Sequence, residues 1–409
     1  MLKRKSCSSL WHSFSASCLL FLLMLSTVQS FGHKVTVLIS CDGFRWDYPQ
    51  YYDTPFLDSM AFHGVKGSLV PSFPSKTFPN HYTLVTGLRP EHHGIIANSF
   101  RDRKTGERFS LGNPKTKFSP RFYHGEPLWL TAQRQGLHTA VFYWPGSDVA
   151  IGGKYPDVWH KYEEKPHLTF TQRADSVVAY LAKKDAPDLI MAYFEEPDAS
   201  GHTYGPQSKK TRHVVESMDS LLSSIWKRVE ALGMKDSVNL VVLSDHGMTW
   251  FTPSRNIRPS NYLHKDWYDA LEGELPCNVY APKPWQQDSI MRALSNVPHL
   301  RAWRKADVPS YLHYQADDNI GDVVVLPDEG YLFYEGETKN GGVHGFDPCY
   351  SDMQAVFRAW GADIRQGVDI GQTSNTMVYP FVCHLLGIKP AANDGDKAFE
   401  AIEGNVFEN

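Results

Sequence analysis

Three stretches of the chain are apolar at almost every position, namely 35–40 (VTVLIS), 189–194 (LIMAYF) and 238–244 (VNLVVLS). Continuous apolar runs of this length are typical of strands that are buried on both faces. Segments with apolar residues at helical spacing lie between these runs, at 54–63, 78–86, 126–136, 170–183 and 208–232. The alternation predicts an α/β fold with a mostly parallel central sheet and helices on both faces.

Residues 250–340 break this alternation, because Pro, Trp and Tyr are frequent and the apolar periodicity is weak. We interpret this segment as a small α+β subdomain inserted into the main domain. Strands are expected within it at 323–326 and 330–334. The chain then returns to the main domain near residue 340, and a helix at about 376–386 closes it.

The first thirty residues have the layout of a secretory signal. Basic residues at 3–5 precede a short apolar run at 19–25, and small or polar residues follow at 26–30. The run is far shorter than the roughly 20 residues that span a bilayer, and no later segment is apolar for that length. We therefore predict a signal peptide at 1–30, a mature chain of 31–409 without a membrane span, and export to the periplasm or the cell exterior.

Composition and charge limit the classes of partner. The chain has 41 basic and 45 acidic residues, for a net charge of −4, which argues against binding to a nucleic-acid duplex. Four cysteines lie outside the predicted signal: Cys41, Cys277, Cys349 and Cys383. In an oxidising compartment they could form any of the three pairings open to four cysteines, although Cys41, inside an apolar run, also fits a buried free thiol.

Acids and histidines follow each of the three apolar runs, and one more histidine lies in the glycine-rich segment GGVHG. These six residues are Asp42, Asp198, His202, Asp245, His246 and His344. Ligands of open α/β sheets bind beyond the carboxyl ends of the strands, so the six side chains are expected at one edge. A catalytic zinc ion takes about three protein ligands, which makes six ligands suitable for two ions about 4 Å apart.

Thr77 is the candidate nucleophile. It precedes a helix that Pro79 predicts to begin at Phe78 or Pro79, and the N-terminus of a helix favours an anion. Metal coordination would lower the pKa of its hydroxyl group. The simpler alternative is that Thr77 only caps the helix. Asn98, in HGIIANSF, can donate its amide to a developing oxyanion, although such an asparagine is also common in turns.

The segments ISCDGFR, FPSKTFPNHYTLVTG, HGIIANS, FEEPDASGHTYGP, LSDHGM and GGVHGF resemble the motifs of the nucleotide pyrophosphatase/phosphodiesterase family of the alkaline phosphatase superfamily. They follow the family order from residue 35 to about 390, and the chain resembles the compact bacterial members. The resemblance implies an alkaline phosphatase-like fold and a phosphodiesterase catalytic domain over 31–409.

The resemblance also implies a role for individual residues. One zinc ion would be held by Asp198, His202 and His344, and the second by Asp42, Asp245 and His246. Thr77 would contact both ions and form a phospho-threonine, with Asn98 as the oxyanion donor. The aromatic rings that stack a nucleotide base would be Phe78 and Tyr162. Further pocket positions would be Trp144, Asp148 and Tyr193.

The expected activity is hydrolysis of a nucleotide phosphodiester or phosphoanhydride with release of a nucleoside 5′-monophosphate. Two alternatives stay open at this point. A glycerophosphocholine- or lysophospholipid-type phosphodiesterase of the same family would use aromatic rings to hold a choline cation. A relative that binds nucleotides without catalysis would have to lose a ligand or the nucleophile, and all seven positions are present.

Overall fold

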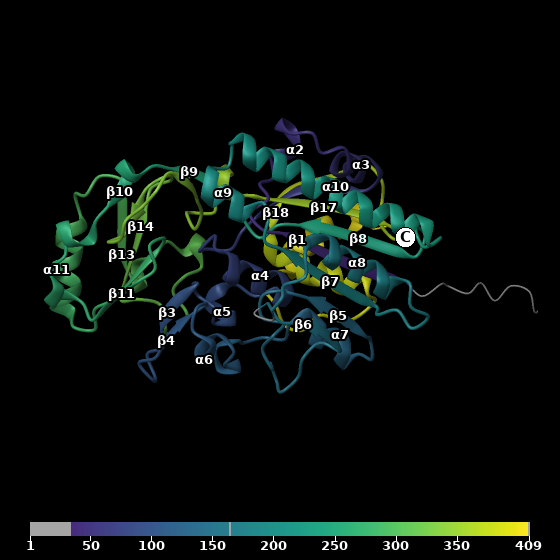
Figure 1. Cartoon of the computed structure of the whole chain (residues 1–409). Helices are drawn as coiled ribbons and strands as arrows, with labels where there is room; N and C mark the ends of the chain where they lie inside the picture. The colour runs from purple at the N-terminus through teal and green to yellow at the C-terminus, as the bar shows by residue number, and fades with distance from the viewer. Residues whose placement is uncertain (1–33, 163–164, 408–409) are drawn as a thin grey trace, which may run out of the picture. The chain divides into compact units, whose positions relative to one another are not determined.

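A computed structural model describes residues 34–162 and 165–407, with an eight-stranded sheet at its centre (Figure 1). In spatial order the strands are β18 (Val368–Ser374), β2 (Val65–Val70), β17 (Ala355–Gly361), β8 (Val238–Leu243), β1 (Val35–Cys41), β7 (Leu189–Phe194), β5 (Thr139–Phe142) and β6 (Val158–His160). Neighbouring strands are parallel except where β17 pairs with β2 and β8. The predicted α/β fold class is confirmed. The predicted signal peptide at 1–30 lies outside the described residues.

The three strands at the centre are the apolar runs of the sequence. Every residue of β1, β7 and β8 is buried. Ile39 of β1 lies between Ala192 of β7 and Val242 of β8, and it is fully inaccessible to solvent. Both faces of these strands are covered, which explains why their sequences are apolar throughout rather than alternating.

Helices cover both faces of the sheet (Figure 1). One layer contains α3 (Pro55–His63), α8 (Phe170–Leu181) and α10 (Lys209–Ala231), and the other contains α4 (Thr77–Thr86), α7 (Leu128–Arg134) and α12 (Val378–Leu385). Residues an odd number apart on a strand face opposite sides. Accordingly, Trp360 of β17 contacts Trp226 of α10, and Phe357 contacts Phe381 of α12. The helices predicted between the central strands are all present, with ends shifted by at most two residues.

A smaller antiparallel sheet lies within the segment where the periodicity weakens. Its strands, in order, are β11 (Ala270–Glu272), β12 (Cys277–Tyr280), β14 (Val323–Pro327) and β13 (Leu300–Arg304). With α11 (Pro284–Leu294) it encloses its own apolar cluster, which includes Val279, Ile290 and Val325. The strand expected at 323–326 is present. The one expected at 330–334 is only β15 (Leu332–Phe333), which pairs with β10 (Asn256–Ile257).

Two predictions of the sequence analysis concern the cysteines and membrane-spanning helices. Cys41, Cys277, Cys349 and Cys383 are all free, and only Cys349 is exposed. Cys41 is therefore the buried thiol that its apolar surroundings suggest. None of the helices within residues 34–162 and 165–407 has the length and apolar character needed to cross a bilayer.

Candidate metal centre and substrate cavity

The topology brings the predicted metal ligands to one edge of the sheet. Strands β8, β1 and β7 are parallel neighbours, so the residues that follow them are also neighbours. Asp42 follows β1, and Asp245 and His246 follow β8. Beyond β7 the chain forms α9 (Asp198–Tyr204), which carries two further ligands. The last ligand, His344, follows β16 (Gly341–Val343), which pairs with β9 (Thr249–Phe251).

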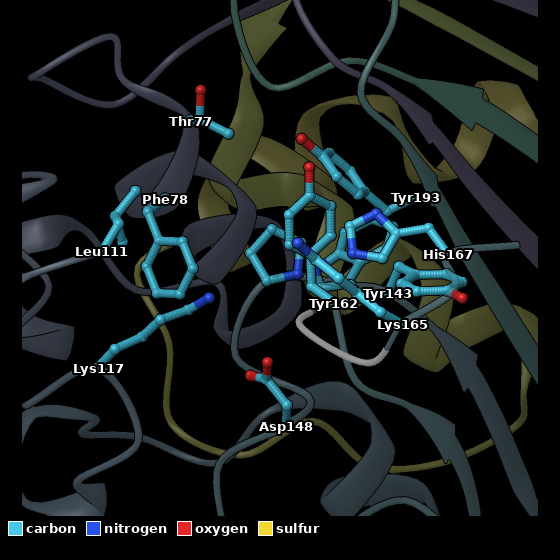
Figure 2. A pocket seen from close by; sticks show the side chains of 12 residues that line it. Thr77, Phe78, Leu111, Lys117, Tyr143, Asp148, Tyr162, Lys165, His167 and Tyr193 are labelled. Atoms are coloured by element: carbon cyan, nitrogen blue, oxygen red, sulfur yellow. The ribbon is translucent and has the colours of Figure 1, made fainter. Parts of the chain in front are cut away.

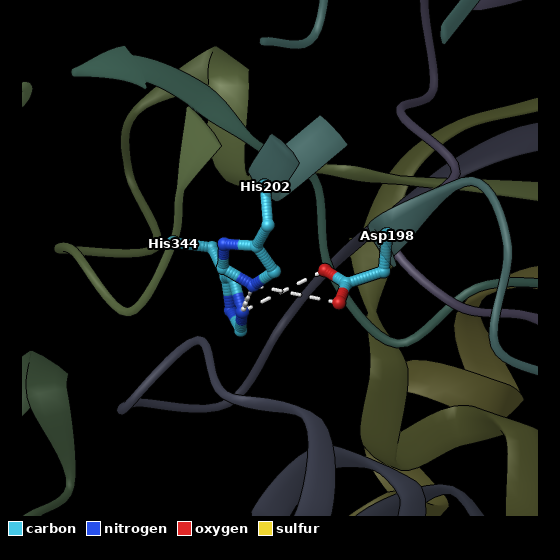
Figure 3. Close-up of side chains that lie close together, drawn as sticks. All are labelled: Asp198, His202 and His344. Atoms are coloured by element: carbon cyan, nitrogen blue, oxygen red, sulfur yellow. Dashed lines mark hydrogen bonds and ion pairs between the residues drawn. The ribbon is translucent and has the colours of Figure 1, made fainter. Parts of the chain in front are cut away.

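Asp198, His202 and His344 form the first candidate ligand group, shown in Figure 3. The Nε2 atom of His202 lies 3.4 Å from Asp198 Oδ2, and the Nε2 atom of His344 lies 3.7 Å from Asp198 Oδ1. The two Nε2 atoms are 3.1 Å apart. Asp198 and His202 share a helix face because they are four residues apart on α9. The three side chains each offer one ligand atom, and these atoms lie within 4.8 Å of one another, close enough to bind a single ion.

The second predicted set, Asp42, Asp245 and His246, is fully buried. The structure divides its members between two candidate ligand groups, which are Asp42, Asp198 and His246, and Asp42, His81 and Asp245. The Nε2 atom of His246 lies 3.0 Å from Asp245 Oδ2 and 3.5 Å from Asp42 Oδ1. Asp198 also has a donor atom within 4.8 Å of donors of Asp42 and His246, so the two groups adjoin. The hydroxyl oxygen of Thr77 lies 3.1 Å from His246 Nε2, at the edge of this second set.

All three histidines are held in the orientation that metal binding requires. Their Nδ1 atoms lie 2.7 to 2.8 Å from backbone carbonyl oxygens, in the pairs His202 with Gly342, His246 with Gly247, and His344 with Ser75. An Nδ1–H group that donates to a carbonyl leaves Nε2 with a free lone pair. Burial, together with His246, Lys76 and His202, lowers the pKa of His344 well below its usual value, so this ring is neutral.

The carboxylates of the two groups also fit metal ions. Asp42 Oδ1, Asp198 Oδ1 and Asp245 Oδ2 are buried and have no hydrogen-bond partner in the described structure. Burial, and repulsion from Asp245 and Asp198, raise the pKa of Asp42 well above its usual value. Burial alone would lower the pKa of His246, yet Asp245 raises it. Buried carboxylates that lie close together repel one another, and a bound cation relieves this repulsion.

Thr77 is the first residue of α4, so this helix begins one or two residues before the predicted start, and Asn98 lies beside its first turn. Helix α4 begins at Thr77, and Lys76 occupies the capping position, so the alternative that Thr77 only caps the helix is wrong. The backbone N–H group of Phe78 donates to Asn98 Oδ1 over 3.3 Å. This contact holds the Asn98 side chain beside the first turn of α4 and leaves its NH2 group as a donor.

A cavity of about 430 Å³ opens beside Thr77. It is lined by all five predicted substrate-binding residues, which are Phe78, Trp144, Asp148, Tyr162 and Tyr193. Figure 2 shows Phe78 and Leu111 on one side of it and Tyr143, Tyr162 and His167 on the other. A cavity of this volume with aromatic walls is typical of small-molecule sites.

The sequence analysis missed several residues of this site. The cavity wall also contains Leu111, Lys117, Tyr143, Pro145, Lys165 and His167, which come from loops and short elements without a recognisable spacing. His81 was also missed, although it lies four residues after Thr77 on the same face of α4. Its Nδ1 atom lies 2.9 Å from the Thr77 carbonyl oxygen and 3.3 Å from Asp245 Oδ2. His81 also belongs with Asp42 and Asp245 to a group of side chains that could hold a metal ion.

Comparisons with known proteins agree with this arrangement. The family model for type I phosphodiesterase/nucleotide pyrophosphatase matches residues 36–347. Human ectonucleotide pyrophosphatase/phosphodiesterase family member 5 is 33% identical over 385 residues, which cover 93% of this chain and 80% of that protein. Bovine bis(5′-adenosyl)-triphosphatase ENPP4 is 35% identical over 364 residues, covering 88% and 79%.

Solved structures show the same likeness. The human member 5 structure superposes with a TM-score of 0.85 at 32% identity, covering 91% of this chain and 99% of that one. An inactive threonine-to-alanine variant of murine member 5, bound to AMP, superposes with a TM-score of 0.85 at 31% identity, covering 92% and 100%.

The chain therefore belongs to the type I phosphodiesterase/nucleotide pyrophosphatase family, within the alkaline phosphatase superfamily. It is a hydrolase of phosphodiester or phosphoanhydride bonds from a metal-dependent family, and its described residues include groups that could hold metal ions.

Proposed function

We propose that this protein hydrolyses nucleotide phosphodiesters or phosphoanhydrides with two zinc ions and releases a nucleoside 5′-monophosphate. Thr77 is the nucleophile in this proposal. The observation that carries it is the position of the Thr77 hydroxyl group, 3.1 Å from His246 Nε2 and in the wall of an aromatic cavity. This position allows one substrate to place its phosphate at the ligand groups and its base between the rings.

In the proposed mechanism the Thr77 oxygen attacks phosphorus in line with the leaving group. The bond to the leaving group breaks, the leaving group departs with the bonding electron pair, and a phospho-threonine that still carries the nucleoside forms. Zinc ions bound to the two ligand groups would lower the pKa of the attacking hydroxyl group and offset the negative charge of the phosphate. The NH2 group of Asn98 donates to the developing oxyanion. Water then attacks the phosphoryl group on Thr77, which frees the nucleoside monophosphate and restores the threonine.

The charges of the cavity favour a nucleotide over a choline ester. The Nζ atom of Lys117 lies 5.9 Å from the ring centre of Phe78 and 5.8 Å from that of Tyr162. These are the rings that a choline cation would need, and a lysine ammonium beside them repels it. A lysine at this position is compatible with an anionic nucleotide. The AMP bound to the murine relative supports the same substrate class, and the inactivity of its threonine-to-alanine variant supports a threonine nucleophile.

The predicted signal and the ectonucleotide relatives support a proposed site of action outside the cytoplasm. Fractionation of the native host, with activity recovered only in the exported fraction, tests this proposal.

The test of the proposed function compares a chromogenic nucleotide diester with a chromogenic phosphorylcholine diester. We expect the zinc-loaded protein to cleave the nucleotide ester, and a chelator to abolish cleavage until zinc is restored. Thr77→Ala should reduce kcat by more than about 10⁴-fold. Thr203→Ala is the matched control, because this exposed hydroxyl group donates only to Ala199 within α9. Cleavage of the choline ester alone, or full activity in Thr77→Ala, would refute the proposal.

A further inference from the structure

A second cavity, of about 580 Å³, lies on the α3 side of the sheet. Its walls come from α3, β2, β18 and the segments 46–50 and 351–354. It shares no lining residue with the substrate cavity, and none of the six metal ligands lines it. Nothing in the proposed mechanism uses it.

The distinctive group in this cavity is Arg358 of β17, which is only 7% exposed. Its Nε atom donates to the carbonyl oxygen of Leu57 over 3.3 Å. Its Nη1 atom donates to the carbonyl oxygens of Phe357 and Gly67, over 2.8 and 3.5 Å. Within residues 34–162 and 165–407, its Nη2 atom makes no hydrogen bond and the guanidinium has no ion pair. A buried cation thus faces the cavity with two N–H groups unused.

The other arginines that are as deeply buried in the described chain are paired with acids. Arg45 lies 2.7 Å from carboxylate oxygens of Asp47 and Asp352, and Arg173 lies 2.6 Å from Glu195. A buried charge without a counterion is costly. Burial lowers the pKa of Arg358 to about 10, against the weak opposing effect of nearby acids. Those acids are Asp58 and Asp369, and neither forms an ion pair with Arg358 in the described chain. An anionic ligand would give Arg358 the direct partner that these acids do not.

The other side chains that line this cavity indicate which chemical groups a ligand could have besides its anionic group. Trp46, Pro49 and Ala61 provide an apolar surface, and Gln354 and Gln372 provide amide groups. Asp58 and Asp369 also line the cavity, although Asp369 is already 3.4 Å from Lys66 Nζ. Lys66 also lines the cavity, so its walls carry two basic and two acidic side chains. This balance does not favour a polyanion, and the acids can accept hydrogen bonds from hydroxyl groups.

We propose that this cavity is a second binding site, for a small hydroxylated organic molecule with one carboxylate or phosphate group that pairs with Arg358. The volume suits a molecule of this size. A charge-assisted hydrogen bond from Nη2 to an anionic oxygen would supply the direct ionic partner that Arg358 lacks in the described chain. The site is separate from the proposed hydrolytic activity and does not depend on it.

Equilibrium dialysis of zinc-loaded protein against radiolabelled inorganic phosphate tests the site. Two variants address it differently: Arg358→Met removes the charge, and Ala61→Trp fills the cavity while retaining the arginine. Arg292→Met, at an exposed position on α11, is the matched control. We expect the wild type and the control to bind one more phosphate per chain than either test variant. Inhibition of the hydrolytic activity by phosphate should be the same in all four proteins, which shows that the metal centre is intact.

Retention of the additional phosphate by Ala61→Trp, with its activity intact, would overturn the proposal even if Arg358→Met failed to fold. Displacement of the label by gluconate or by glycerol 3-phosphate distinguishes a carboxylate ligand from a phosphate ligand. If neither compound displaces it, the site takes an inorganic ion only, and the inference of an organic ligand is wrong.

Discussion

Tyr193→Phe isolates one hydrogen bond to a candidate metal ligand. The Tyr193 hydroxyl group lies 2.6 Å from Asp42 Oδ2, and both side chains are buried. Burial and the Asp42 charge raise the pKa of Tyr193 well above its usual value, so the hydroxyl group keeps its proton and donates it. The substitution removes this donor and leaves the ring in place.

The expected effect follows from the strength of that bond. A hydrogen bond to a charged acceptor contributes about 1.5–3 kcal/mol, and about 1.4 kcal/mol corresponds to a tenfold change in binding. Zinc should therefore bind about 10- to 100-fold more weakly, which is also the usual effect of losing a partner of a metal ligand. At saturating zinc, kcat should return to near the wild-type value because the Asp42 carboxylate itself is unchanged.

Zinc affinity measured by competition with a chromogenic chelator tests this reasoning. Tyr143→Phe is the control, because this tyrosine lines the same cavity but its hydroxyl group accepts only from the backbone of Leu168, over 3.1 Å. Equal zinc affinity in wild type and Tyr193→Phe would show that the hydroxyl group does not support a metal ligand. A loss of kcat that zinc cannot restore would place Tyr193 in substrate binding instead.

Three further changes have defined outcomes. Phe78→Ala should raise KM for nucleotide esters about 5- to 100-fold, the effect of losing one stacked base, and leave KM for a diester without a base unchanged in steady-state assays. Burial, followed by repulsion from Asp352, raises the pKa of Glu329 from 4.5 to about 7. The folded state then holds this proton more tightly than the unfolded state, so stability falls as pH rises from 4.5 to 7. The Glu329→Gln variant should lack this pH-dependent fall in stability, so that its melting temperature changes less between pH 5 and pH 8 than that of the wild type. Ile39→Ala, at the centre of the sheet, should lower the free energy of unfolding in urea by about 2–5 kcal/mol.

Each of these three predictions has an experimental result that would contradict it. An equal rise in KM for both ester types would show that Phe78 does not stack a base. A parallel pH dependence in Glu329→Gln and wild type would assign the loss of stability to other groups. A negligible effect of Ile39→Ala would mean that this site collapses without leaving a cavity.

The centre of the fold was predictable because burial on both faces makes β1, β7 and β8 apolar at every position. The convergence of most candidate ligands was predictable for a related reason, since they come just after these strands or share a helix turn, whereas His344 follows the short strand β16. Strand β17 was not predicted. It carries Arg358 among apolar residues, and it runs against its neighbours without a helix to mark its connection.

Other strands lack a signal because of their position in the sheet. Strand β18 is an edge strand with the sequence VDIGQTS, and none of its residues is fully buried. Strand β6, at the other edge, has three half-buried residues. The cavity wall was only partly predictable for a different reason. Lys117 ends the four-residue helix α6 (Pro114–Lys117), and His167 lies in a loop, so tertiary packing alone brings them into the cavity wall.

The order of the metal ligands along the chain has a consequence for synthesis and folding. The ligands begin at Asp42 and end at His344, and the backbone carbonyls that orient the histidines are equally dispersed, from Ser75 to Gly342. A ribosome-bound chain that has not yet reached residue 344 lacks one of the first group's donors. Under the proposed mechanism, hydrolysis begins only after nearly the whole chain has been made and has folded, so the onset of activity would report completed folding.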